Sequence, residues 1–229
     1  MQYSTFAAID IGSYDVILEI FEISKKQGIR SVDKICHRME LGKDTYTLGK
    51  IRPEMEEELC RVLADFVRIM EGYRVDAYRA MASSAISEAA NSLYVLGKIR
   101  QLTGLSVTVL SNSEQRFLGY KALAAMEDNF NKIIEKGTAI LDLDGGSFQI
   151  SLFDKDALVT TQNIRMGSLR IRERLAGIQS ETEHYEEMVE ELIWNEVSSF
   201  KKMYLKDRKI ENIMLIGDVF TDSCLLYTS

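Results

Sequence analysis

The chain has 229 residues, 46% of them hydrophobic and only one of them proline, which is enough apolar material for one domain or two small lobes. Its formal net charge of -7 excludes a broad electrostatic attraction to nucleic acid or to an anionic membrane surface. No apolar stretch approaches the roughly 18 residues that cross a bilayer, and the N-terminus lacks the pattern of a signal peptide. We therefore expect a cytoplasmic globular protein.

The cysteines and histidines offer no obvious cross-link or metal cluster. Cys36, Cys60 and Cys224 lack C-x-x-C spacing, and such an odd, isolated set is typical of reduced thiols in the cytoplasm. His37 and His184 are far apart in the sequence. No structural zinc site is predicted.

The N-terminal part reads as strands followed by a helix. Two apolar runs within residues 3–23 are interrupted by Gly12-Ser13-Tyr14-Asp15, which predicts a strand hairpin. A third strand is expected over residues 29–41, and then a loop that ends at Pro53, a residue suited to the first turn of a helix. Apolar residues then recur every three or four positions, which predicts an amphipathic helix with a core-facing stripe. That stripe consists of Met55, Leu59, Val62, Leu63, Phe66, Val67 and Met70.

The rest of the chain alternates strands and helices. Strands are predicted at residues 78–81, 106–110, 138–142, 148–153, 157–164 and 213–216, and helices up to Thr103, from about Ser113 and over residues 182–204. This alternation indicates an α/β architecture, and the two hairpins look like duplicated halves. After the last strand a helix should cover the sheet, but only a short tail ending in "DSCLLYTS" follows. We expect the second lobe to be truncated, with a cloning or assembly artefact as its tail.

Each hairpin places an aspartate at the end of a strand, just before small residues. The two segments are Asp10-Ile11-Gly12-Ser13 and Asp142-Leu143-Asp144-Gly145. Backbone N–H groups at small residues can approach phosphate oxygens, and a carboxylate at a strand end can hold magnesium through water. Either segment alone also suits an ordinary hairpin turn with a capping aspartate. The occurrence of two matched segments favours two phosphate-binding loops.

Several segments, in order, resemble motifs of one family. "AIDIGSYD" is similar to A-I-D-I-G-S-N-S, "MELGKDTYTLGKI" to R-L-G-x-G-x-x-x-x-G, and "MASSAISEAAN" to A-T-S-A-x-R-x-A-x-N. "VLSNSEQRFLGYKAL" resembles I-S-G-x-E-E-A-x-L-x-Y, "LDLDGGSFQI" resembles D-I-G-G-G-S-T-E-L, and "IRMGSLRIRERL" resembles L-x-x-G-x-V-R-L-T-E. These motifs belong to the exopolyphosphatase / guanosine pentaphosphate phosphohydrolase (Ppx/GppA) family, within the actin, sugar-kinase and Hsp70 superfamily.

The resemblance implies a fold and an activity. The fold is α/β, of the actin-like, Hsp70-like and sugar-kinase-like ATPase type, with two lobes that each carry a mixed sheet flanked by helices. The first lobe is expected at residues 1–124 and the incomplete second lobe at 125–229, with both loops facing one phosphate-binding cleft. The family releases the terminal phosphate of inorganic polyphosphate or guanosine pentaphosphate, using magnesium and a water that a glutamate activates.

The resemblance also implies a set of site residues. The phosphate-binding positions are Gly12, Ser13, Gly145, Gly146, Ser147 and Ser87, and the metal-binding positions are Asp10, Asp142 and Asp144. Polyphosphate or a guanosine nucleotide is the implied partner, Mg²⁺ the implied cofactor, and nucleic acid and membranes are not expected. The oligomeric state stays open, with a homodimer as one option.

The departures from the family pattern fall on the catalytic positions. The two family glutamates correspond to Gln115 and Gln149, and an amide cannot act as a general base, a role typically worth about 10²- to 10⁴-fold in rate. Glu114 precedes the first of these positions and is an alternative base, although one residue turns a helical side chain by about 100°. Asp144 replaces a glycine and is either a new metal ligand or a solvated turn residue.

Cationic positions also differ. A family arginine corresponds to Ser87, and Arg116 and Arg79 are the candidates to replace that phosphate contact. The asparagine of the first loop is Tyr14. Three arginines alternate along one segment, Arg165, Arg170 and Arg172. Two of them are predicted to share a strand face, as a solvated edge or as an anion-binding rim.

Two functions therefore remain open at the level of the sequence. The chain is a phosphoanhydride hydrolase with weakened activity, or it is an inactive relative that binds polyphosphate, a guanosine nucleotide or a protein partner. A nucleotide-binding scaffold or a sugar kinase is disfavoured, because "LIGDVFTDS" lacks the glycine pair that would pack on an adenosine.

Overall fold

The computed structural model describes residues 3–127, 129–176, 184–206, 208–217 and 225–228. The chain forms two compact units, Met1–Ser111 and Asn112–Ser229. The sequence interpretation assigned residues 112–124 to the first lobe. In the structure these residues lie in a helix whose Tyr120 and Leu123 pack into the core of the second unit, so the division falls at the start of that helix.

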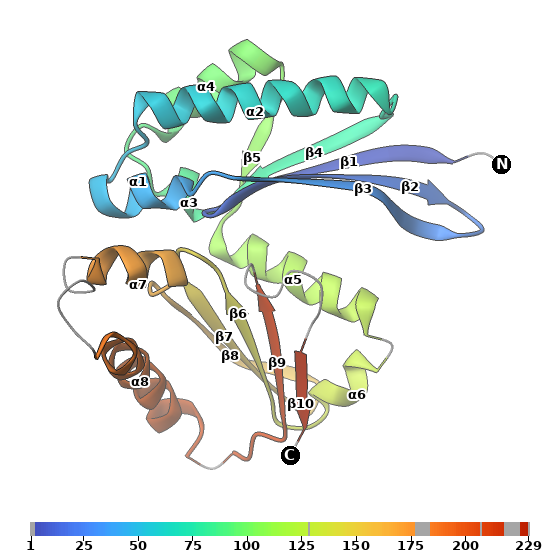
Figure 1. Ribbon diagram of the computed structural model, residues 1–229. Coiled ribbons are helices and arrows are strands. Elements are labelled where there is room, and N and C mark those ends of the chain that lie inside the picture. The colour runs from blue at the N-terminus through green and yellow to red at the C-terminus, as the bar shows by residue number, and fades with distance from the viewer. Residues whose placement is uncertain (1–2, 128, 177–183, 207, 218–224, 229) are drawn as a thin grey trace. The chain divides into compact units, whose positions relative to one another are not determined.

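The first unit is a mixed sheet with helices on one face (Figure 1). Its elements are β1 (Ser4–Ile11), β2 (Asp15–Ser24), β3 (Gly28–Arg38), α1 (Leu41–Leu48), α2 (Pro53–Gly72), β4 (Ala77–Ala82), α3 (Ser84–Ser87), α4 (Ser92–Thr103) and β5 (Val107–Val109). The strand order is β3-β2-β1-β4-β5. The first three strands pair antiparallel, and β4 and β5 continue the sheet in parallel.

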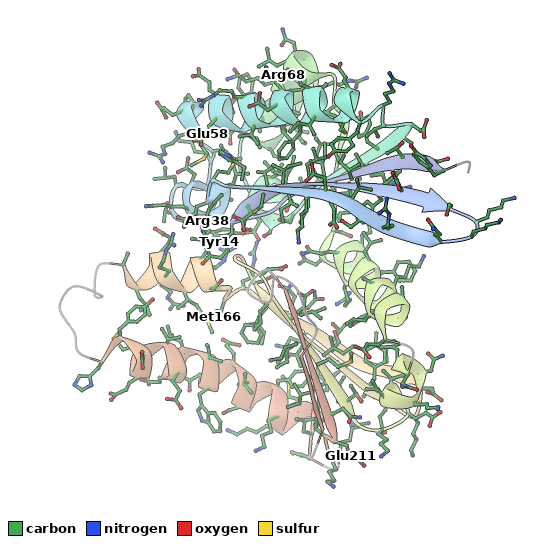
Figure 2. All side chains as sticks on the ribbon, turned by 45° about the vertical axis from the view of Figure 1, so that its right-hand side comes forward. Tyr14, Arg38, Glu58, Arg68, Met166 and Glu211 are labelled. Atoms are coloured by element: carbon green, nitrogen blue, oxygen red, sulfur yellow. The ribbon has the colours of Figure 1, made fainter. Side chains whose placement is uncertain are left out.

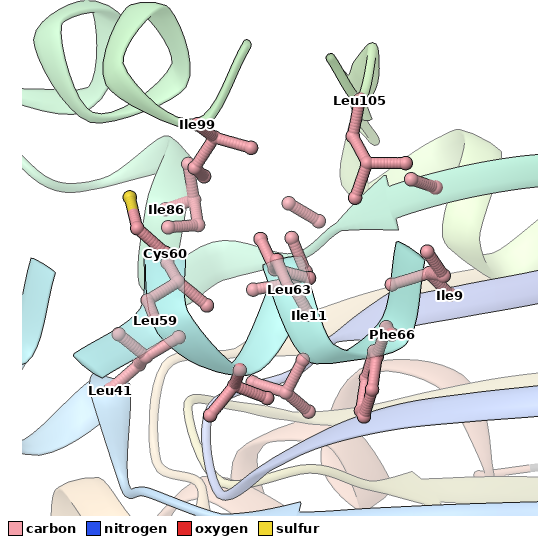
Figure 3. Close-up of a cluster of buried hydrophobic side chains, with 14 of the residues drawn as sticks. Ile9, Ile11, Leu41, Leu59, Cys60, Leu63, Phe66, Ile86, Ile99 and Leu105 are labelled. Atoms are coloured by element: carbon pink, nitrogen blue, oxygen red, sulfur yellow. The ribbon is translucent and has the colours of Figure 1, made fainter. Parts of the chain in front are cut away.

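The core of the first unit lies between the sheet and helices α2 and α4 (Figure 3). The predicted stripe of α2 supplies Leu59, Leu63 and Phe66, which are almost completely buried against Ile9 and Ile11 of β1. Each such side chain contributes about 1.5–3 kcal/mol when it leaves water. The periodicity of α2 was therefore a correct guide to the core.

Two features of the first unit were wrongly predicted. The loop before Pro53 contains helix α1, which has no apolar stripe and is held by the buried, polar Asp44 and Thr45. The helix expected to run up to Thr103 is interrupted after Ser87, where the N–H of Ala90 donates to the carbonyl oxygen of Gly49 instead of continuing the helix. Both differences arise from contacts between segments that are distant in sequence.

The second unit repeats this design with helices on both faces of the sheet (Figure 1). Its elements are α5 (Asn112–Met126), α6 (Phe130–Ile134), β6 (Thr138–Leu143), β7 (Phe148–Asp154), β8 (Ala157–Ile164), α7 (Ser168–Leu175), α8 (Tyr185–Tyr204), β9 (Asn212–Gly217) and β10 (Leu225–Thr228). The strand order is β10-β9-β6-β7-β8, with β9 parallel to β6. Strand β7 is buried on both sides: Phe153 packs with α5 and α6, and Phe148 and Ile150 pack with Phe200 of α8.

The two sheets place their aspartates at equivalent points. Asp10 on β1 pairs with Ile17 of β2 and with Met81 of β4. Asp142 on β6 pairs with Gln149 of β7 and with Ile216 of β9. In both units, therefore, the aspartate lies on the central strand, one residue before the loop. The expectation of duplicated halves is confirmed.

The strand expected around Arg165, Arg170 and Arg172 is wrong. The chain enters helix α7 at Ser168, so Arg170 and Arg172 lie on a helix and no two of the three arginines share a strand face. The stripe predicted on α8 is only partly covered, and Phe200 is its fully buried member. The predicted helix start at residue 182, the end of "LIGDVFTDS" and Cys224 lie outside the described residues.

The stability of the first unit should depend on Asn91. Its side chain accepts a hydrogen bond from the Ile51 N–H at 3.0 Å and donates one to the Ile51 carbonyl at 2.8 Å. Asn91→Ala would leave both backbone groups of the buried Ile51 unpaired, so we expect a loss of about 1–3 kcal/mol in the free energy of unfolding. Urea denaturation measures it. The exposed Asn195→Ala is the control, and an equal effect of both substitutions would contradict the assignment.

Candidate functional site

The first loop is a tight turn whose carbonyl groups are held by the segment that follows β3. The Gly12 N–H donates to the Asp15 carbonyl at 2.9 Å and closes the turn. The carbonyl of Ser13 accepts from the Gly42 N–H, and that of Tyr14 accepts from the N–H groups of residues 39 and 40. Because the C=O and N–H of a trans peptide point in opposite directions, the N–H groups that follow these carbonyls point away from that segment.

The side chain of Ser13 is part of a chain of hydroxyl groups. It is almost fully buried, and its Oγ lies 2.7 Å from the Tyr46 hydroxyl. That hydroxyl lies 2.8 Å from Ser84 Oγ on α3. The sequence identified Ser13 but missed Tyr46 and Ser84, although both lie within the quoted motifs. Their contact brings α1 and α3 to the first loop.

The remaining candidates of the first unit lie on its surface. The ring of Tyr14 packs beneath the guanidinium of Arg38, 4.8 Å from ring centroid to Cζ, a cation–π contact between residues labelled in Figure 2. Ser87 is the exposed last residue of α3, and Arg79 is exposed on β4. Asp10 is exposed on the central strand.

The second loop repeats the turn of the first. The Asp144 N–H donates to the Ser147 carbonyl at 3.0 Å, which matches the bond between Gly12 and Asp15. Helix α7 then donates hydrogen bonds to the carbonyl groups of the loop. The Ser168 N–H donates to the Asp144 carbonyl, and the Arg170 N–H donates to the Gly145 carbonyl. Arg170 Nε adds a hydrogen bond to the Gly146 carbonyl at 2.9 Å.

These hydrogen bonds orient three successive peptide groups. With the carbonyls of residues 144, 145 and 146 all directed at α7, the N–H groups of Gly145, Gly146 and Ser147 point the opposite way. No peptide bond of the described chain is cis. A row of N–H groups on one side of a tight loop is a concavity suited to an anion such as phosphate. The Ser147 hydroxyl accepts a hydrogen bond from Asn163 of β8.

Gly167 permits this close approach of α7 to the loop. A Cβ atom at Gly167 would lie 2.4 Å from the Asp144 oxygen and equally close to the Gly145 carbonyl group, all of them backbone atoms. The φ angle of Gly167 is -73°, which any residue can adopt, so the need for glycine is purely steric. The sequence motif contained this glycine, but only the structure shows that it packs against the backbone of Asp144 and Gly145.

The two glutamines are both engaged in hydrogen bonds with other side chains. Gln115 Nε2 on α5 donates to Asp144 Oδ2 at 2.7 Å. Two substitutions that looked independent in the sequence, one at a family glutamate and one at a family glycine, therefore form a contact. Glu114 is exposed, about 100° around the helix from Gln115.

Gln149 lies beneath α5 within a polar network. Its side chain is buried, and Oε1 accepts from Nη1 of Arg116 at 3.1 Å. The same nitrogen donates to Thr161 Oγ1 at 2.8 Å, and Nη2 donates to Ser113 Oγ. Arg116 thus binds α5 to β7 and β8. These bonds engage the guanidinium that the sequence offered as a replacement phosphate contact.

The acidic residues do not form a ready-made metal cage. Within the described ranges, no group of three or more histidine, cysteine, aspartate or glutamate side chains is arranged to hold a metal ion. Asp142 and Asp144 lie in the same strand-to-loop segment of the second unit. Their hard carboxylate oxygens suit magnesium, which commonly uses one or two protein carboxylates together with water and substrate phosphates.

An apolar cavity of about 560 Å³ lies between the second sheet and α8. Its walls include Leu141, Ile150, Val189 and Val197, and Asp144 is its one ionisable side chain apart from the phenol of Tyr185. A phosphate chain requires hydrogen-bond donors and cations, so this cavity does not suit it.

The described cysteines are not activated as nucleophiles. Burial raises the pKa of the Cys60 thiol, and burial together with the nearby Asp15 carboxylate raises the pKa of Cys36. A raised pKa lowers the thiolate fraction at neutral pH. In the part of the chain that the structure describes, no helix has the length and apolar character required to cross a membrane.

The duplicated sheets, each with a strand–loop–strand turn on its central strands, define a two-unit protein of the actin-like ATPase fold. The chain belongs to the Ppx/GppA phosphatase family, whose sequence profile matches residues 19–229. The resemblance noted from the motifs is confirmed.

Two curated proteins illustrate the relationship. Exopolyphosphatase 1 of Mycobacterium leprae is 26% identical over 144 residues, which is 62% of this chain and 41% of that protein. The bifunctional 3-dehydroquinate synthase/phosphatase of Fusobacterium nucleatum is 22% identical over 174 residues, 73% of this chain and 26% of that protein. The chain thus spans well under half the length of these relatives.

Solved structures share the fold. The Aquifex aeolicus Ppx/GppA family member superposes with a TM-score of 0.70 at 23% identity, over 96% of this chain and 68% of that one. An exopolyphosphatase from Cytophaga hutchinsonii gives a TM-score of 0.71 at 18% identity, over 93% of this chain and 66% of that one.

The close approach at Gly167 can be tested directly. Gly167→Ala forces the new methyl group against the backbone of Asp144 and Gly145, so we expect a loss of about 1–3 kcal/mol in unfolding free energy from overpacking. Urea denaturation measures it. The control is Gly97→Ala in α4, where a Cβ meets nothing within 4 Å and the helix should gain about 0.5–1 kcal/mol. A neutral effect at Gly167 would show that α7 does not pack on the loop as described.

Proposed function

We propose that this chain binds inorganic polyphosphate or guanosine pentaphosphate through its two loops and hydrolyses the terminal phosphoanhydride bond with weakened activity. The observation that carries the proposal is the orientation of the Gly145, Gly146 and Ser147 N–H groups by α7. Such a row of donors recognises phosphate oxygens of any chain and does not require a base or sugar. The exopolyphosphatase and phosphatase activities in the names of the two curated relatives agree with this chemistry.

Each loop contributes the same kind of contact in this proposal. In the first unit the Gly12 N–H closes the turn, so the N–H groups of Tyr14 and Asp15, next to the Ser13 residue of the loop, would be the backbone donors. Ser87 stands where the family has an arginine. Because the Ser13 hydroxyl is buried against Tyr46, we assign phosphate binding there to the backbone and not to that hydroxyl. The loss of a guanidinium at Ser87 removes a charged hydrogen bond, which weakens substrate binding.

Magnesium fits the acidic positions of the proposal. Asp142 and Asp144 would hold it in the second unit and Asp10 in the first, together with water and phosphate oxygens. When bound, the ion would neutralise phosphate charge and polarise the bond that breaks. The protein groups around it would align the chain, and Gln115 would hold the Asp144 carboxylate in place through its amide.

The proposed hydrolase lacks a carboxylate at the positions where the family has its water-activating glutamates. Gln115 and Gln149 occupy the positions of the family glutamates, and neither amide can take a proton from water at neutral pH. Glu114 is the remaining carboxylate next to those positions on α5. Hydrolysis would therefore be slow and would rely on positioning and on charge neutralisation.

The second candidate is a binding protein without turnover. It is favoured by the fact that both glutamine side chains are engaged with neighbouring groups, Gln115 with Asp144 and Gln149 with Arg116. Such a protein would sense or store polyphosphate or a guanosine nucleotide, or present it to a partner. Under either candidate we place the protein in the cytoplasm, away from nucleic acid and membranes, with a homodimer as one assembly to test.

The decisive assay measures phosphate release from long-chain polyphosphate and from guanosine pentaphosphate, each with and without magnesium. Slow, magnesium-dependent release from one of them supports the hydrolase. Saturable binding without release supports the binding protein. Absence of both binding and release would refute the proposed function.

Restoring the family residues should restore the chemistry. In Gln115→Glu with Gln149→Glu, the new carboxylate at 115 would lie at hydrogen-bonding distance from Asp144, and repulsion would raise one of the two pKa values. Adding Asp144→Gly removes that repulsion. We expect the triple variant to exceed the parent chain in polyphosphate hydrolysis by at least about 10²-fold, the low end of a positioned base, and to exceed the double variant as well.

The control for the double variant keeps the same change in charge. Gln27→Glu with Gln101→Glu adds two carboxylates at exposed positions of the first unit and should leave the rate unchanged. A parent chain that already turns over rapidly would show that Glu114 or another carboxylate is the base. Equal rates in the parent and the triple variant would contradict the role assigned to position 115.

A further inference from the structure

The two loops differ in how their third carbonyl is held. The hydrogen bond that closes the turn is donated by Gly12 in the first loop and by Asp144 in the second, so these two residues correspond. Tyr14 therefore corresponds to Gly146. The Tyr14 carbonyl is held by two backbone N–H groups, those of Met39 and Glu40. The Gly146 carbonyl instead accepts from a side chain, Arg170 Nε at 2.9 Å.

Among the described residues, the segment after β8 gives the Gly146 carbonyl no backbone donor like those that Met39 and Glu40 give Tyr14. There the Met166 N–H turns back to the Ile164 carbonyl at 2.7 Å. The backbone of α7 reaches the Asp144 and Gly145 carbonyls, and the Arg170 side chain reaches one peptide further. A planar guanidinium suits this task, because its donors keep a fixed geometry.

We propose that Arg170 is a positioning residue that fixes the Gly146–Ser147 peptide, so that the Ser147 N–H is presented to a phosphate group. The ligand in this proposal, phosphate, is taken from the proposed function. The orientation of the Gly146–Ser147 peptide does not depend on that function. Without the Arg170 side chain this peptide can rotate, and the Ser147 N–H then no longer points the same way as the N–H groups of Gly145 and Gly146. Arg170 acts through the loop and not by contact with the anion.

The first experiment needs no ligand. Hydrogen exchange of the 144–147 amides is compared in the parent chain, Arg170→Met and Arg174→Met, the last being an exposed arginine on the same helix. We expect the Asp144 amide, whose hydrogen bond to the Ser147 carbonyl closes the turn, to exchange at least about tenfold faster in Arg170→Met and to be unchanged in Arg174→Met. Unchanged exchange in Arg170→Met would overturn the proposal.

The second experiment measures the binding of inorganic tripolyphosphate by calorimetry in the absence of magnesium. Arg170→Met should weaken binding by at least about tenfold, and Arg174→Met by less than about twofold. Arg170→Lys keeps the charge but cannot reproduce the Nε contact, so it should resemble Arg170→Met. Free guanidinium ion at millimolar concentration should restore part of the affinity of Arg170→Met.

The outcomes separate the two proposals. Parental affinity in Arg170→Lys would indicate a direct charge contact and would overturn the positioning role. If the parent chain fails to bind tripolyphosphate, the proposed function fails, and the hydrogen exchange of the Asp144 amide still decides on Arg170. Fast exchange throughout the second unit in Arg170→Met would show a general loss of structure and would likewise refute a specific role at this peptide.

Discussion

The arrangement of both loops depends on one constraint: the segment that follows the third strand of each unit, β3 or β8, donates hydrogen bonds to the loop carbonyls. In the first unit that segment leads into α1, and in the second it is the start of α7. Because that segment holds the carbonyl groups, the N–H groups of the loops point the other way and can act as backbone donors. Under the proposed function, the same arrangement in both units would let a protein with a net charge of -7 bind phosphate through backbone N–H groups.

The departures from the family motifs form a consistent set in the structure. The amide of Gln115 and the carboxylate of Asp144 are complementary, whereas a glutamate and an aspartate at these positions would repel each other. Gln149 likewise accepts from Arg116 within a network that includes Thr161. These contacts are compatible with both proposed functions, slow turnover and binding without turnover.

Much of the fold was predictable because it is encoded locally. The stripe of α2, the proline at its first turn and the alternation of strands and helices follow from helical and strand periodicity. Helix α1 and the interruption before α4 were missed, because long-range contacts such as those of Thr45 with Ala85 and of Asn91 with Ile51 stabilise them. Arg170 was assigned to a strand because alternation in sequence cannot reveal the helix that begins at Ser168.

The sequence by itself determined the family, the two loops and the identity of the altered positions, because these depend on residue types in a fixed order. Only the tertiary structure decided which partners those residues have. It brought Gln115 of α5 to Asp144, Arg116 to Gln149, and Arg170 of α7 to Gly146. Contacts between side chains and backbone groups from different elements depend on how those elements pack, and that packing is a property of the whole unit, which no single motif carries.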